Sequence, residues 1–157
     1  MFNITSTTST NGKDKDKEEA NFKKQMDNVY LTSQTAEAFV KDNYYNFLDN
    51  DRSKLLRLYK ENSMVLWNGT ELRGLEKIEG LYRELPPTVH KVECYDAQYI
   101  LGTNQQVTSM MITVSGKVTL AGQVTHQFQQ TLVLTKDPVN QNFYLGNDCM
   151  RLTSTCT

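Results

Sequence analysis

Apolar residues in the first half of the chain follow a helical period. Between Thr32 and Pro86 they recur at steps of three and four residues, which places them on one face of a helix. Three such stripes can be traced: Ala36, Phe39, Val40, Tyr44, Phe47 and Leu48; Leu55, Leu58 and Tyr59; and Leu75, Ile78, Leu81, Tyr82 and Leu85. The pattern predicts three amphipathic helices, the last of which ends at Pro86-Pro87 because proline cannot continue a helix.

Short polar segments separate these helices. Residues 49–51 (Asp-Asn-Asp) break the first stripe and can cap the second helix. Residues 64–67 and 70–73 flank Asn68-Gly69, a pair that tolerates the positive φ values of a tight turn. We therefore expect a β-hairpin between the second and third helices.

After Pro87 the helical period disappears and long β-rich runs follow. Four runs are present, at about 88–101, 106–120, 123–136 and 142–153, joined by short turns at 102–104, 121–122 and 138–140. Helices and strands do not alternate, so the pattern predicts a segregated α+β domain. The economical assembly is a long, curved, antiparallel sheet with the helices packed on one face.

The first 28 residues lack such a pattern. A Ser/Thr/Asn-rich stretch is followed at 13–19 by a mixed-charge run with no apolar surface to bury. We therefore predict a disordered tail over 1–28 and a folded domain over 29–157.

Alternation along the central strands separates two faces of the sheet. Even positions from Met110 to Leu120 are mostly apolar and should meet the helices, as should Phe128, Leu132 and Leu134. The other face is then formed by Val107, Ser109, Met111, Thr113, Ser115, Thr125, Gln127, Gln129, Thr131, Val133 and Thr135, with Lys117 as its main cation. Depletion of charge is typical of an interface core, although Thr and Gln are also compatible with a solvated sheet face.

The distribution of charge supports an interface. The chain has 157 residues and a formal net charge of −1, but residues 1–90 carry 27 of the 35 charged side chains and residues 91–157 only eight. Near-neutral charge argues against a domain that binds mainly nucleic-acid phosphates. The sequence has no apolar run long enough for a membrane-spanning helix and no secretory signal pattern.

The candidate metal and redox residues are few and scattered. Cys94, Cys149 and Cys156 include no C-x-x-C pair, and His90 and His126 stand alone. This spacing is not that of a zinc site or a thiol redox motif. We expect reduced thiols, with Cys94 and Cys149 packed within the sheet, and neither a metal nor a cofactor.

A series of residues in fixed order resembles a known family. They are Tyr44, Tyr45, Phe47, Leu48, Asp49, Asp51, Arg52, Leu55 and Tyr59; Leu66, Trp67 and Gly69; Gly74, Leu85 and Pro86; Asp96 and Gln98; Phe128, Gln130, Leu132 and Leu134; and Asn147, Asp148, Cys149, Met150, Arg151 and Leu152. Together they resemble the nuclear transport factor 2-like family over about residues 33–153. The resemblance implies a cone of three helices wrapped by a bent antiparallel sheet, whose outer face is used for dimerisation.

Two differences indicate a branch of that family. Import carriers that bind the small GTPase Ran in its GDP form use an acid after the tryptophan and acids in the hairpin between the longest strands. This chain has Asn68 after Trp67, and residues 119–123 contain no acid. The pattern is instead similar to the NTF2-related export proteins, small subunits of the mRNA export receptor. A homodimeric Ran–GDP carrier is the alternative.

This resemblance implies a non-catalytic partner for the large export chain. Arg151 would form a salt bridge to an acid of that chain. Phenylalanine–glycine nucleoporins and RNA would be contacted mainly through the partner, and the protein would shuttle between nucleus, nuclear pore and cytoplasm. The expected partner-binding residues are Arg151, Cys149, Asn147, Gln129, Thr131, Val133, Met111 and Thr113.

An enzyme remains a further alternative, since similar cones include ketosteroid isomerases and scytalone dehydratases. Such chemistry needs an aspartate base and hydrogen-bond donors aimed at one oxyanion. Candidates are Asp96, Asp148, His90 and His126, with Tyr44, Tyr59 and Tyr95. If His90, Val92, Cys94 and Asp96 share the helix-facing side of their strand, Asp96 points into the cone. Asp148 has the parity of Met150 and Leu152 and is expected to do the same, and a structural role for both acids is the competing interpretation.

Overall fold

The computed structural model describes residues 14–17, 19–20 and 34–155. The chain divides into two compact units, residues 1–31 and 32–157, and the second unit holds the fold. Residues 14–17 and 19–20 are helical and exposed. The rest of the predicted tail, and Cys156, lie outside the described residues, so the disorder of the tail stays a prediction.

The first predicted helix is present but contains a wider turn. It is helical from Gln34, continues as η1 (Phe39–Tyr44), a π-helix, and ends as α2 (Tyr45–Asn50). A π-turn adds a residue to each turn, and here both Tyr44 and Tyr45 are buried. The predicted stripe included Tyr44 but not Tyr45, because it assumed a regular helical period.

The hairpin and the third helix agree with the pattern, whereas the second helix ends at Leu56, so Leu58 and Tyr59 of its predicted stripe lie beyond it. Helix α3 (Arg52–Leu56) begins after Asp51, whose side chain accepts a hydrogen bond from the Lys54 N–H. Strands β1 (Met64–Trp67) and β2 (Thr70–Arg73) form the predicted hairpin, and α4 (Leu75–Glu84) ends before the two prolines. The turn residues Asn68 and Gly69 have φ values of 45° and 88°.

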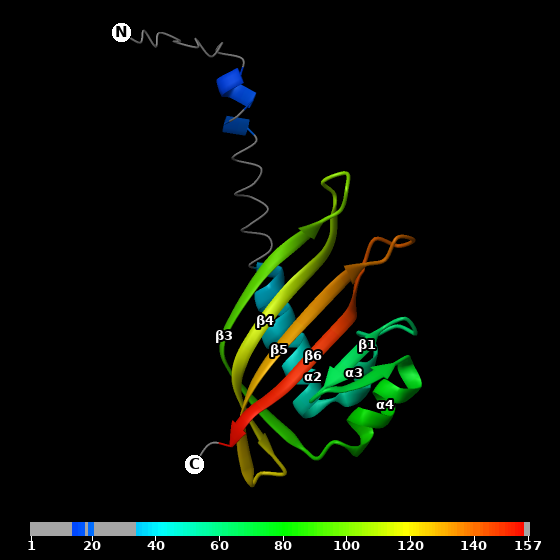
Figure 1. Cartoon of the computed structure of the whole chain (residues 1–157), viewed down its shortest axis with the longest axis vertical. Coiled ribbons are helices and arrows are strands. Elements are labelled where there is room, and N and C mark those ends of the chain that lie inside the picture. Colours follow the sequence, from blue (N-terminus) through cyan, green and yellow to red (C-terminus); the bar gives the residue numbers. More distant parts are fainter. Residues whose placement is uncertain (1–13, 18, 21–33, 156–157) are drawn as a thin grey trace, which may run out of the picture. The chain divides into compact units, whose positions relative to one another are not determined.

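Four long strands follow and complete one sheet. They are β3 (Thr88–Leu101), β4 (Val107–Leu120), β5 (Val124–Lys136) and β6 (Phe143–Thr155). The described strands form a six-stranded sheet in the order β2-β1-β6-β5-β4-β3 (Figure 1). The long strands are antiparallel as predicted. Strand β1, however, pairs with β6 in parallel, an arrangement that the residue pattern did not predict.

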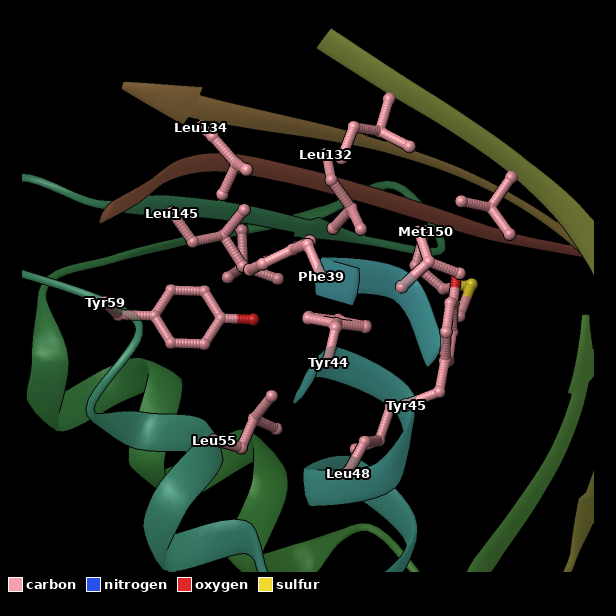
Figure 2. Packing of buried hydrophobic residues seen from close by; sticks show 14 of the residues in the cluster. Phe39, Tyr44, Tyr45, Leu48, Leu55, Tyr59, Leu132, Leu134, Leu145 and Met150 are labelled. Carbon is pink, nitrogen blue, oxygen red and sulfur yellow. The ribbon is translucent and has the colours of Figure 1, made fainter. Parts of the chain in front are cut away.

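The core lies between the first helix and the inner face of the sheet. Leu132, Leu134, Leu145 and Met150 of the sheet lie opposite Phe39, Tyr44, Leu48 and Leu55 of the helical layer (Figure 2). The predicted inward positions of β4 and β5 are correct, since Met110, Ile112, Val114, Val118, Phe128, Leu132 and Leu134 are buried. The sheet therefore has one apolar face and one face free for other contacts.

A β-bulge in β3 overturns one prediction. The register with β4 shifts between Val92 and Cys94, so Glu93 has no partner residue of its own. An extra residue reverses the alternation of every position beyond it. Cys94 and Asp96 therefore point away from the helices and are exposed, not packed in the sheet or directed into the cone.

Gly116 explains why the bulge lies at this point. A Cβ atom on Gly116 would lie 2.2 Å from the backbone oxygen of Lys91 and 3.1 Å from the Phe128 ring. Only glycine permits this close approach of the two strands. The position of Asp96 thus depends on a glycine in the neighbouring strand.

Candidate partner-binding surface

The face of the sheet that is turned away from the helices, here called the outer face, is built from cross-strand rows. On β3 to β6 they are Cys94, Ser115, Gln129 and Arg151; Asp96, Thr113, Thr131 and Cys149; and Gln98, Met111, Val133 and Asn147. Strands β1 and β2 extend the second row with Leu66 and Glu71, and the third with Met64 and Arg73. All eight predicted partner-binding residues lie in these rows, so the structure brings them together on one surface.

The rows on β3 to β6 are nearly free of charge. Asp96 and Arg151 are their charged residues, and the other positions are Cys, Ser, Thr, Gln, Asn, Met and Val. A shallow depression of about 350 Å³ opens over the first two rows. Next to it, Leu66 on β1 is 36% exposed. Cys149, like Cys94, is exposed here, which corrects the prediction that both thiols are packed within the sheet.

The hairpin turn holds the backbone on both sides of Arg151. The Asn68 N–H donates to the Met150 oxygen at 2.9 Å, and the Leu152 N–H donates to Asn68 Oδ1 at 2.8 Å. Arg151 Nη2 lies 3.5 Å from the position that a Cβ of Gly69 would occupy. The guanidinium forms no ion pair or hydrogen bond with the residues that the structure describes, so the backbone at Arg151 is fixed while its charge is unpaired.

The other predicted acid, Asp148, lies inside the cone and is 2% exposed. Its Oδ2 accepts hydrogen bonds from the hydroxyls of Tyr44 and Tyr59 at 2.7 Å and of Tyr82 at 3.2 Å. Its Oδ1 accepts from Gln130 Nε2 at 2.7 Å. Burial raises the pKa of Asp148, and the hydrogen bonds from Gln130 and the tyrosines partly offset that effect.

These groups form a closed network, here called the Asp148 cage (Asp148, Tyr44, Tyr59, Tyr82 and Gln130). Gln130 Nε2 also donates to the Tyr44 hydroxyl, and its Oε1 accepts from the Tyr45 hydroxyl. Burial raises the pKa of Tyr44, Tyr59 and Tyr82, so all three keep their protons. A general base needs a lone pair that can reach a substrate, whereas the Asp148 oxygens are taken by donors of the cage. The cage ties η1, α4 and the segment after α3 to the sheet.

The remaining enzyme candidates do not join this network. His90 lies near Asp49 instead: its Nδ1 is 2.6 Å from Asp49 Oδ1, and its backbone N–H donates to Asp49 Oδ2 at 2.8 Å. His90 Nε2 is buried without a partner among the described residues. His126 and Tyr95 are half-buried on other parts of the sheet. Within the described part of the chain, no three His, Cys, Asp or Glu side chains are grouped so that they could hold a metal ion.

Asp49 provides a pH-dependent prediction. Burial alone would raise its pKa, but hydrogen bonds from the side chain and backbone of His90 and from Thr88 outweigh burial and hold the pKa below its usual value. The stabilisation that these hydrogen bonds provide is complete above about pH 4, which is the pKa of aspartate in the unfolded chain. It is lost as the pH falls through the lower pKa that Asp49 has in the folded protein. We expect Asp49→Asn to cost about 1–2 kcal/mol at pH 7, with a smaller difference from wild type below pH 4.

Urea unfolding at pH 3, 4, 5 and 7 measures this difference. Asp42→Asn is the control, because the Asp42 side chain has no hydrogen bond or ion pair with the described residues, and its effect should be small at every pH. A loss for Asp49→Asn that is as large at pH 3 as at pH 7 would contradict the assigned hydrogen bonds.

Comparison with known proteins places this fold. A profile of the Nuclear transport factor 2 (NTF2) domain matches residues 35–152, which is most of the chain. The chain belongs to the nuclear transport factor 2 family. The NTF2-like fold predicted from the sequence is therefore confirmed. Separately, none of the helices described in the structure is long and apolar enough to cross a membrane.

Several curated relatives of this chain are export and transport proteins. Human NTF2-related export protein 2 is 32% identical over 119 residues, which cover 74% of this chain and 83% of that protein. Nuclear transport factor 2 of Schizosaccharomyces pombe is 33% identical over 112 residues, covering 69% and 86%. The structure of the Candida albicans Mtr2–Mex67 M domain complex matches with a TM-score of 0.64 at 15% identity, covering 80% of this chain and 98% of the matched chain. That last similarity concerns the fold alone.

Sequence reasoning missed two parts of the site. Asp96 was placed on the wrong face, and Gly116 was the available signal, because a glycine inside a strand often marks a bulge. The extension of the outer face by Leu66 and Met64 depends on the parallel pairing of β1 with β6. No local pattern reveals that pairing, since it joins residues about 80 positions apart.

Proposed function

We propose that this chain is the small, non-catalytic subunit of an mRNA export receptor. In this proposal its outer face covers the outer face of the NTF2-like domain of a large export chain. Its contribution is structural: it keeps the apolar and uncharged surface of that domain out of water. The large chain then supplies most contacts to phenylalanine–glycine nucleoporins and to RNA, and the pair shuttles between nucleus, nuclear pore and cytoplasm.

The observation that carries the proposal is the composition of the outer face around Arg151. A surface with few charges is typical of the buried centre of an interface. The hairpin turn fixes the backbone on both sides of Arg151, and its side chain has no partner among the described residues. Burying an arginine without an acid is costly, whereas an acid on the partner makes it a specific contact.

The relatives support the same role. Several of them are named NTF2-related export proteins. One structural neighbour is Mtr2 in complex with the Mex67 M domain, which is an arrangement of a small chain of this fold with part of a larger protein. The interior supports a non-catalytic subunit as well, because the buried acid is enclosed by the Asp148 cage.

Co-expression with the NTF2-like domain of the large export chain tests the proposal. We expect the two chains to elute together in size-exclusion chromatography, with a light-scattering mass equal to one copy of each. The second candidate, a homodimeric carrier, predicts a stable dimer of this chain alone that binds Ran–GDP and ignores the large chain. That result would overturn the proposal. Asn68 and the acid-free turn at 119–123 argue against the homodimeric carrier.

A further inference from the structure

The bulge at Glu93 brings the carboxylate of Asp96 to the outer face, in the rows that also contain Arg151. Asp96 lies on β3 in the second row, and Arg151 lies on β6 in the first row. They are three strands apart, which corresponds to roughly 15 Å at the spacing of neighbouring strands. Within the three rows on β3 to β6 these are the two charged side chains, one negative and one positive. Further charges of the outer face lie around them: Glu71 and Arg73 on β2, and Lys117 in the next row of β4, 4.0 Å from Glu93.

Both charges are unpaired within the described part of the chain. Asp96, like Arg151, forms no hydrogen bond or ion pair with described residues, and both are exposed. The positions between them, Thr113, Ser115, Gln129 and Thr131, are uncharged. A partner that covers the face removes water from both charges at once, so an acid opposite Arg151 alone leaves Asp96 desolvated and unpaired, at substantial cost.

We infer that Asp96 is a second partner-recognition residue, and that the partner presents a lysine or arginine to it. The inference rests on the proposed function, in which the outer face is the heterodimer interface. Two opposite charges in a fixed order define one orientation of the partner and reject a face with the charges reversed. Asp96 therefore contributes to the choice of partner as well as to affinity.

The geometry also indicates where the partner's cation lies. A sister domain packed face to face can be related to this chain by a pseudo-two-fold axis that lies between the sheets, midway between Asp96 and Arg151. Such an axis brings Asp96 opposite the partner's counterpart of Arg151, and Arg151 opposite the partner's counterpart of Asp96. The cation that meets Asp96 then lies on the last strand of the partner, and the acid that meets Arg151 lies on the strand equivalent to β3.

Charge reversal at Asp96 tests this inference. We measure the affinity of the full chain for the NTF2-like domain of the large export chain by calorimetry. Asp96→Lys should weaken binding by roughly 100-fold or more, and Asp96→Asn by about 5- to 20-fold, because charged contacts in an interface act through both pairing and desolvation. Glu79→Lys, the same charge change at an exposed position of α4, should change affinity less than twofold.

The outcomes separate this inference from the proposed function. Replacing the cation on the partner's last strand with an acid should raise the affinity for Asp96→Lys at least tenfold. Wild-type affinity of Asp96→Lys, together with loss of binding in Arg151→Glu, would overturn the role of Asp96 and leave the heterodimer intact. If the wild-type chain itself does not bind the domain, the proposed function fails and this inference fails with it. Thermal unfolding of each variant verifies that the fold is unchanged.

Discussion

Replacing Asp148 with alanine is expected to lower the free energy of unfolding by about 3–5 kcal/mol, because it leaves four buried hydrogen-bond donors without their acceptor. The donors belong to Tyr44, Tyr59, Tyr82 and Gln130. They come from η1, from the segment after α3, from α4 and from β5, so the substitution separates the helical layer from the sheet as well as removing one side chain. A loss of this size is a large part of the stability of a domain of this length.

Chemical unfolding of the variants at pH 7 measures the effect. Asp148→Asn should cost less than alanine, because an amide keeps the acceptor for Gln130 and the tyrosine hydroxyls can rotate to accept from its NH2 group. Asp96→Ala serves as the control: it removes an exposed aspartate with no partner among the described residues, so we expect a change within about 0.5 kcal/mol. Equal stability of Asp148→Ala and Asp96→Ala would show that the cage does not stabilise the fold.

The stabilising role of the cage bears on the enzyme alternative. Relatives of this chain with curated names are export and transport proteins. The acid in its interior has the burial and raised pKa that a catalytic carboxyl often has. Its hydrogen bonds favour the structural role, since the donors that surround it also occupy its oxygens. Here the perturbed pKa is a property of the core.

Local sequence patterns predicted the elements of this fold well. Asn68-Gly69 identified the hairpin because the positive φ values that the turn requires fall on these two residues. The alternation along β4 and β5 identified the two faces because the sheet buries one side continuously. In each case the signal and the structure it specifies involve the same short segment.

The features that were missed depend on contacts between distant segments. The outward position of Asp96 depends on the closeness of Gly116 to the Lys91 backbone. The burial of Tyr45 follows from the π-turn, which allows it to reach Gln130 on β5. A periodicity argument assumes regular strands and helices, so one extra residue in either changes which side chains share a face. Arg151 was identified through family resemblance and because it is the only charged residue besides Asp148 in residues 141–157.

Replacing Arg151 with glutamate is expected to weaken binding to the NTF2-like domain of the large export chain by roughly 100- to 1,000-fold. The variant removes the cation and places a second acid against the acid that the partner is proposed to carry. Arg151→Ala removes the cation without adding repulsion, so its loss should be smaller. The fold should remain intact, because the Arg151 side chain has no partner in the described part of the chain.

Calorimetric titration and thermal unfolding of the same samples separate binding from folding. Arg83→Glu is the matched control: Arg83 is exposed on α4, outside the sheet, and undergoes the same change of charge. Its affinity should stay within twofold of wild type, although both variants alter the net charge equally. If Arg151→Glu binds as tightly as Arg83→Glu, the outer face around Arg151 is not the interface. If both lose affinity equally, overall charge and not a specific contact governs association, and raising the salt concentration should then remove the difference from wild type.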